Sequence, residues 1–180
     1  MISTDSGATW SNTTGLDARF DIELFFDHAQ GQVVYALDHL SVFRSDDAGR
    51  TWISCSNTNA EFGFINSRAA IDPRSSNHLI VATRGSGVLT SSDGCKTWQF
   101  RKTGLGNLFV NTVAIDPQNP DRVYAGTDGG AYVSFDGGNS WHPINDGLLG
   151  ALAVYSIVID PRNSSVYATT PYGVFRLEVQ

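Results

Sequence analysis

The sequence of 180 residues has few charged side chains and almost no lysine. Charged residues make up 17% of the chain, Lys96 and Lys102 are its two lysines, and its formal net charge is −6. A general nucleic-acid binder needs a surplus of Lys and Arg for phosphate contacts, so the composition argues against that class. No apolar run approaches the roughly 18–20 residues of a membrane span, and no charged n-region followed by an apolar h-region marks a signal peptide.

Cysteine and histidine are also scarce. Cys55 and Cys95 allow one disulfide in an oxidising compartment but no disulfide framework, and the sequence leaves their pairing open. The four histidines occupy unrelated positions without the spacing of metal ligands: His28, His39, His78 and His142. The glycine-rich run 126–130 joins two expected strands, with no helix N-terminus to hold a phosphate. We therefore expect neither a metal site nor a cofactor.

The sequence does contain one eight-residue pattern four times. The copies read STDSGATW (3–10), SDDAGRTW (45–52), SSDGCKTW (91–98) and SFDGGNSW (134–141), and their tryptophans are 42, 46 and 43 residues apart. In such a turn the Asp carboxylate accepts several backbone N–H groups, the Gly adopts a positive φ, and the hydroxyls close the loop. Cys95 is the one departure, at the Gly position. A constant period of this kind predicts a repeat protein.

Each repeat contains further strands around this turn. An apolar run ends in Asp at 24–27, 69–72, 113–116 and 157–160, and in three copies Pro follows. A second and a third apolar segment precede the turn, and a fourth begins at its Trp. Four short antiparallel strands per roughly 43 residues predict an all-β fold, a β-propeller of four-stranded blades. The approximate blades are 20–57, 64–103, 109–146, and 153–180 together with 1–14. A β-sandwich would give no reason for so regular a period.

The phase of the repeat leaves two arrangements open. The chain spans four whole periods cut within the third strand, so the N-terminal strand at Trp10 would close the last blade if four blades form a ring. Alternatively the four blades are part of a larger ring. One version of this is a homodimer in which two chains share eight blades.

The pattern S-x-D-x-G-x-T-W resembles the Asp-box of bacterial-neuraminidase-type (BNR) repeats. The fuller unit from Val113 to Trp141 is similar to the blades of xyloglucanase-type glycoside hydrolases, sortilin-type receptors and photosystem II assembly factors. The resemblance covers essentially the whole chain and implies a β-propeller in an extracellular or periplasmic setting. Because Asp-boxes in that superfamily are structural turns, it implies a folding role for these residues: Asp5, Trp10, Asp47, Trp52, Asp93, Trp98, Asp136 and Trp141.

Candidate binding residues fall on the face opposite the Asp-bearing turns, where the loops differ most between repeats. From the second-to-third loops and the channel mouth we select Glu23, Asp38, His39, Arg68, Arg84, Asp128 and Tyr172. Loops between blades add Asp17, Arg19, Asp21, Glu61, Phe62, Asn107, Phe109, Asp146 and Tyr155. The positions four residues before the strand-ending Asp are Glu23, Arg68, Thr112 and Ser156. They would ring the channel mouth, with an ion pair between Glu23 and Arg68.

These candidates favour a non-catalytic binding or assembly module that recognises a glycan or a protein partner. The alternative is a glycoside hydrolase of the xyloglucanase-like kind, or a fragment of one. Glycoside hydrolysis needs two carboxylates at a defined separation, and nothing singles out a pair among the eligible residues: Asp21, Glu23, Asp38, Glu61 and Asp128. A sialidase is disfavoured because the Arg-Ile-Pro signature that accompanies true sialidases is absent.

Overall fold

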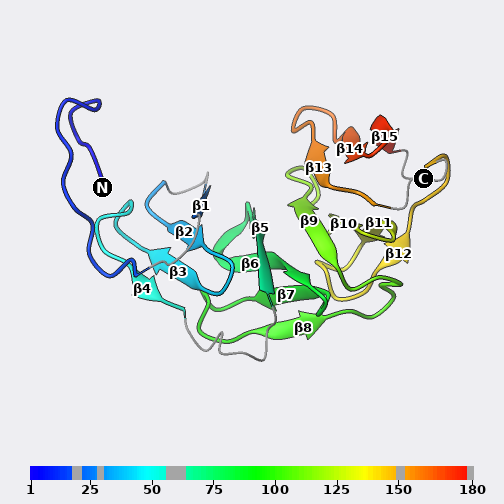
Figure 1. Ribbon diagram of the computed structural model, residues 1–180, viewed down its shortest axis with the longest axis horizontal. Helices are drawn as coiled ribbons and strands as arrows, with labels where there is room; N and C mark the ends of the chain where they lie inside the picture. The colour runs from blue at the N-terminus through cyan, green and yellow to red at the C-terminus, as the bar shows by residue number, and fades with distance from the viewer. Residues whose placement is uncertain (18–21, 28–30, 56–63, 149–152, 178–180) are drawn as a thin grey trace.

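The computed structural model describes residues 1–17, 22–27, 31–55, 64–148 and 153–177. Arg19, Asp21, His28, Glu61 and Phe62, which the sequence analysis considered, lie outside these ranges. The described residues form strands and turns without a helix, so no helix among them is long and apolar enough to cross a membrane. Fifteen strands of the described residues make four antiparallel sheets that follow an open arc, with the first and the last described residues toward its opposite ends (Figure 1).

The sheets follow one another along the chain. The first comprises β1 (Glu23–Phe26), β2 (Val34–Leu37), β3 (Val42–Ser45) and β4 (Ile53–Ser54). The second comprises β5 (Phe64–Asp72), β6 (Ser75–Arg84), β7 (Val88–Ser91) and β8 (Gln99–Arg101). The third comprises β9 (Val110–Ile115), β10 (Val123–Thr127), β11 (Gly130–Ser134) and β12 (His142–Pro143). The fourth comprises β13 (Ser156–Ile159), β14 (Val166–Thr170) and β15 (Gly173–Leu177).

This architecture confirms the all-β propeller fold with antiparallel blades. The first strands of the four sheets are the innermost, since β5 contacts both β1 and β9, and β9 contacts β13. Three of the four inner strands end where an Asp makes a turn: Asp72, Asp116 and Asp160 accept the amide N–H two residues later at 2.8, 2.9 and 3.0 Å. At the Asp-Pro sequences the Asp side chain thus forms a turn with the backbone just after the strand.

The hydrophobic core lies between neighbouring sheets. Ala69 and Ile71 of β5 pack against a cluster that contains Tyr35, Leu37 and Val42 of the first sheet. The same positions of the next two inner strands, Val113 with Ile115 and Ile157 with Ile159, pack against the sheet before them. Neighbouring sheets therefore bury apolar surface against one another, as in other repeat proteins.

The four Asp-bearing turns share one set of hydrogen bonds. In the turn at Asp136, Oδ1 accepts from Ser134 Oγ at 2.7 Å and from the Ser140 amide at 2.9 Å, and Oδ2 accepts from Ser140 Oγ at 2.6 Å. The corresponding three bonds form at Asp5, Asp47 and Asp93. These bonds support the structural role expected for the Asp side chains.

Hydrogen bonding also lowers the pKa of these carboxyl groups to about 2 from the ordinary 3.8. At Asp5 and Asp93 the hydroxyl of the following Thr contributes most, and at Asp47 the backbone amide of Thr51 does. At Asp136 burial acts in the opposite direction, and the bonds from Ser140 and Ser134 outweigh it. The turns are therefore built around ionised aspartates.

The single departure from the motif has a structural consequence. Cys95 has a φ of 69° at the position where the other turns have Gly. It forms a disulfide with Cys55, with a Cα–Cα distance of 5.4 Å. The pairing that the sequence left open thus links the end of the first sheet to the turn of the second.

The N-terminal segment does not close the last sheet within the described residues. Ile2 pairs with Ser11, Thr14 pairs with Thr51 of the first sheet, and the segment lies at the other end of the arc from β15 (Figure 1). Of the two arrangements that the sequence left open, closure by Trp10 is therefore not seen in the described residues: Trp10 is 60% exposed. Thr14 accepts the Trp52 amide, and Gly15 lies so close that a Cβ there would collide with the Trp52 carbonyl, so the segment is joined to the first sheet.

Candidate functional site

The loops that join the second strand to the third lie on one face, which we call the loop rim. One backbone hydrogen bond joins each of the first three loops to the sheet that follows it, or to the residues just before that sheet. The bonds are Ile65 N–H to His39 O at 3.0 Å, Gly85 N–H to Leu108 O at 3.0 Å, and Val154 N–H to Thr127 O at 2.8 Å. The loops are therefore held in fixed relative positions on a scaffold of strands.

Glu23 and Arg68 form the ion pair that their repeat positions predict. Arg68 Nη1 contacts Glu23 Oε1, and the two side chains are 51% and 38% exposed. The pairing of β5 with β6 shifts register between Ile65 and Ala69, so Arg68 lies in a bulge. Such a half-exposed pair joins the inner strands of the first two sheets and contributes only modestly to stability.

The other two members of the expected ring differ from this pair. Thr112 is buried, and Ser156 is partly buried. The four side chains therefore do not form an evenly exposed ring, because only two of them are long enough to extend from the strand to solvent.

Asp38 holds its loop and is not available to a ligand. The residue is 1% exposed, and its Oδ1 accepts the amides of Leu40 at 2.7 Å and Ser41 at 2.6 Å. His39 beside it is exposed, with Nδ1 3.4 Å from the carbonyl oxygen of Ile65. The first loop thus presents a histidine rather than the carboxylate.

Asp128 and Arg84 are exposed on the loops of the neighbouring sheets. Asp128 Oδ1 accepts a hydrogen bond at 2.8 Å from Nδ2 of Asn111, which also donates to the Val154 carbonyl at 3.2 Å. Asn111 occupies a bulge of β9, where the register shifts. Sequence reasoning missed it, although the polar pair Asn111-Thr112 inside an apolar run was a usable signal.

Three exposed aromatic residues lie on the rim of the third and fourth sheets. Phe109 is 48% exposed, Tyr155 54% and Tyr172 73%. Backbone bonds fix two of them, since Asp128 N–H donates to Phe109 O at 3.1 Å and Tyr155 N–H donates to Thr169 O at 2.9 Å. This part of the rim therefore presents apolar rings from rigid positions.

Three of the described carboxylates on this face are engaged in structural contacts. Glu23 pairs with Arg68, Asp38 accepts backbone amides, and Asp128 accepts from Asn111. Among the described residues no group of three or more His, Cys, Asp or Glu side chains is arranged to hold a metal ion. The chemistry that this rim offers is recognition by aromatic rings and polar groups.

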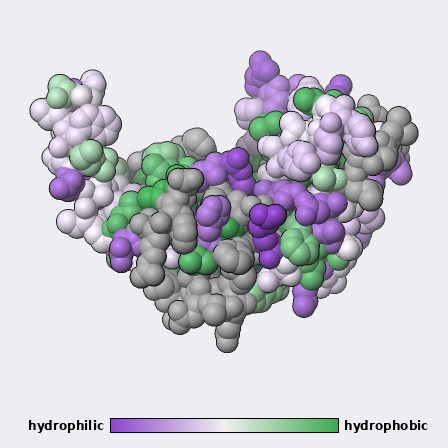
Figure 2. Space-filling model, in the orientation of Figure 1, coloured by the Kyte–Doolittle hydropathy of each residue, from purple (hydrophilic) through white to green (hydrophobic). Residues whose placement is uncertain are grey.

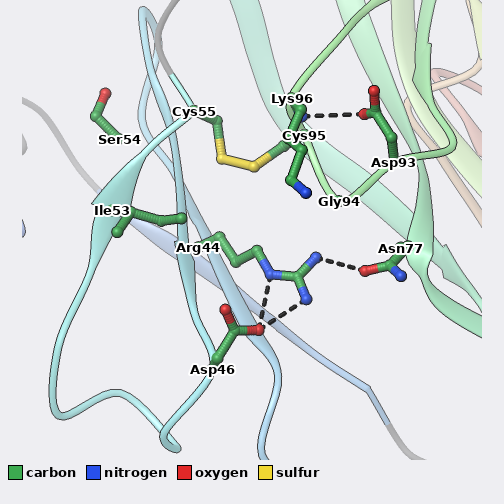
Figure 3. A pocket seen from close by; sticks show the side chains of 10 residues that line it. All are labelled: Arg44, Asp46, Ile53, Ser54, Cys55, Asn77, Asp93, Gly94, Cys95 and Lys96. Carbon is green, nitrogen blue, oxygen red and sulfur yellow. Dashed lines mark hydrogen bonds and ion pairs between the residues drawn. A yellow bond between two sulfur atoms is a disulfide. The ribbon is translucent and has the colours of Figure 1, made fainter.

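A separate groove of about 540 Å³ lies between the first two sheets, away from the loop rim and beside the disulfide (Figure 3). Arg44 crosses it, with Nε 2.8 Å from Asp46 Oδ1 and Nη1 2.7 Å from Asn77 Oδ1. Nη1 is also 2.8 Å from the Tyr35 hydroxyl. Through these bonds the guanidinium of Arg44 joins the two sheets, so the groove has a structural role. The sequence did not predict this contact.

No protein-family model matches the sequence, and no curated protein matches it significantly. Among solved structures, the GH74 enzyme of Niastella koreensis matches with a TM-score of 0.67 and 21% identity, over 84% of this chain and 26% of that one. The GH74 xyloglucanase of Xanthomonas campestris matches with a TM-score of 0.64 and 18% identity, over 82% of this chain and 26% of that one. YCF48 bound to D1 peptide matches with a TM-score of 0.57 and 14% identity, over 89% of this chain and 55% of that one.

These similarities concern the fold. The chain spans about a quarter of the length of the GH74 enzymes and about half that of YCF48. At these identities, fold does not determine which site, if any, is shared.

Proposed function

We propose that the chain is a propeller of Asp-box (BNR-type) blades, a single domain that binds a glycan or protein partner through its loop rim without catalysis. The observation that carries this proposal is the set of exposed rings Phe109, Tyr155 and Tyr172 on the loop rim, the first two held by backbone hydrogen bonds. Exposed aromatic residues on a rigid scaffold are a common basis of recognition, because they provide contact area at low entropic cost.

The partner classes follow from the chemistry of the rim. Aromatic rings stack on sugar faces and on apolar peptide side chains, and the polar groups of Asn111 and Asp128 can hydrogen bond to either. The likeness to YCF48, whose structure contains a D1 peptide, supports the peptide class. The likeness to a xyloglucanase supports the glycan class. The disulfide supports an oxidising, extracellular or periplasmic setting.

The test is a screen of glycan and peptide arrays with the 180-residue chain, followed by titration of the best ligand. Tyr155→Ala and Tyr172→Ala should each weaken binding by about thirtyfold, the roughly 2 kcal/mol of an aromatic hot spot. Phe135→Ala is the matched control, because Phe135 is also exposed but lies in an Asp-bearing turn on the other face. Equal losses in all three variants would contradict a rim site.

The alternative function is glycoside hydrolysis, favoured by the fold shared with GH74 enzymes. It is tested by measuring reducing ends released from xyloglucan. We expect no release, since Glu23, Asp38 and Asp128 are held in structural contacts. Hydrolysis that Asp128→Asn abolishes while binding persists would overturn the non-catalytic proposal.

A further inference from the structure

The segment 1–15 folds as the outer part of a blade. Ile2 pairs with Ser11 nine positions later, and the third and fourth strands of the first three sheets pair with the same spacing. These pairs are Arg44 with Ile53, Thr90 with Gln99, and Val133 with His142. The residues after Ile2 contain a complete Asp-bearing turn. The segment therefore has the structure of a third-strand end, a turn and a fourth strand.

This segment contacts the first sheet as one blade contacts the next. Thr14 pairs in parallel with Thr51 and accepts the Trp52 amide at 2.9 Å. Thr103, at the end of the second sheet, does the same with Ser140 and Trp141, also at 2.9 Å. The segment thus occupies the outer edge of a blade position that precedes β1, while none of the described residues supplies the three inner strands there.

The fourth sheet has the strands of a blade that the segment 1–15 lacks. It contains the three inner strands β13, β14 and β15, and no described residue pairs with the outer edge of β15. Inside the chain, two of these Trp residues belong to the same hydrophobic cluster as a residue of the third strand of their sheet: Trp52 with Phe43, and Trp141 with Tyr132. Phe175 is the equivalent position of β15, and Trp10 has no such strand beside it within the described residues.

Both ends of the arc also expose apolar faces that are buried elsewhere. Leu24 and Phe26 are 47% and 52% exposed, although the same positions of the next three inner strands pack on a preceding sheet. They line a hollow of about 340 Å³ with Leu16 and Trp52, and Figure 2 shows hydrophobic surface over this first sheet. At the other end Val158 and Val174 are 59% and 69% exposed.

We propose that a second copy of this chain covers these faces, so that two arcs form one closed eight-bladed ring. The fourth sheet of each copy enters the blade position beside β1 of the other, and the segment 1–15 supplies its missing turn and fourth strand. Arg176 of one copy takes the place of Ile2 against Ser11 of the other, and Trp10 packs on Phe175. The occupant is a second copy because the outer edge of β15 has no described partner and the described segment 1–15 supplies the turn and outer strand that fit it. Two identical interfaces then close the ring.

The test is the mass of the 180-residue chain by light scattering and sedimentation equilibrium. A dimer of twice the 19.5 kDa chain mass is expected. A monomer at about 100 µM would overturn the proposal, because a Kd below about 10 µM gives mostly dimer there. Trimers or open filaments would also overturn it, since neither is a two-copy ring.

Paired variants distinguish the two faces from misfolding. Phe26→Asp alone and Val174→Asp alone should each be monomeric, since each change disrupts both interfaces of a self-associated ring. Mixed in equal amounts they should form a heterodimer, because one interface then joins two unaltered faces. Ile53→Asp, a charge on an exposed residue of β4 away from both faces, is the control and should remain dimeric.

A cross-link identifies which chain supplies the strand. Ser11→Cys combined with Arg176→Cys should give a covalent dimer on non-reducing electrophoresis. A cross-link within one chain, at monomer mass, would instead show that the four blades close on themselves. That outcome would overturn the second copy as the occupant.

Discussion

The turns at Asp5 and Asp136 have the same local structure in very different surroundings. Both carboxylates accept from the Ser two residues earlier and from the amide and hydroxyl four residues later. Yet the Trp that follows is 60% exposed at Trp10 and 2% exposed at Trp141. The turn is therefore made by its own residues, whereas burial of its Trp depends on the strands and sheets beside it.

The two Trp residues should differ most in their effect on stability. Trp141→Ala should lower the free energy of unfolding by about 3–5 kcal/mol, because it removes a large buried side chain. Trp10→Ala, made in the Val174→Asp background that keeps the chain monomeric, should change it by less than about 0.5 kcal/mol. Urea denaturation measures both, and similar losses in the two variants would show that Trp10 is already buried in one chain.

Loss of the disulfide should have the next largest effect on the free energy of unfolding. The bridge occurs at only one of the four turns. Cys55→Ser should cost about 2–4 kcal/mol, as expected for a bridge that closes a loop of 40 residues. Cys95→Gly should cost roughly 1 kcal/mol less, because it restores glycine at a φ of 69°. Denaturation of the oxidised chain and both variants tests this ranking, and equal losses would mean that the backbone at Cys95 carries no strain.

The aspartates themselves should show a smaller difference. Asp136→Ala should lower the free energy of unfolding by about 1–2 kcal/mol, because it removes charge-assisted hydrogen bonds at a surface turn. The melting temperature should then fall by roughly 3–6 °C. Asp136→Asn keeps one acceptor oxygen and should therefore lower the free energy of unfolding by less. Asp5→Ala should have less effect on the melting temperature of the monomeric background, where its turn lies at the end of the arc. An unchanged melting temperature in Asp136→Ala would refute the folding role.

Acid should produce the smallest effect at any one turn, although it acts on all four turns at once. Because folding lowers the pKa of the turn aspartates to about 2 from 3.8, their stabilisation is complete above about pH 4. It is lost as the pH falls toward 2 and the carboxylates take up protons. Melting curves between pH 5 and 2 should show this decline, and it should be shallower in Asp136→Asn, which has one turn carboxylate fewer.

Much of the fold could be predicted because its signals are local and repeated. The Asp-bearing turns, the Asp-Pro strand ends and the antiparallel strands follow from residues within a few positions of each other. The contact of Glu23 with Arg68 could also be predicted, since the repeat phase places both on neighbouring inner strands. Asn111 was missed because a bulge depends on how two strands pair. The burial of Asp38 was missed because a loop carboxylate can face either solvent or its own backbone amides.

The sequence by itself determined the repeat, the chemistry of each turn and the alternation of strands, because these depend on φ preferences, short hydrogen bonds and apolar patterning. The tertiary structure decided which faces are covered, whether Cys55 reaches Cys95, and on which side of the arc the segment 1–15 lies. The physical reason is that each of these depends on how one sheet packs against the next. Every repeat carries the same local pattern, but only its position along the arc decides what its neighbours are.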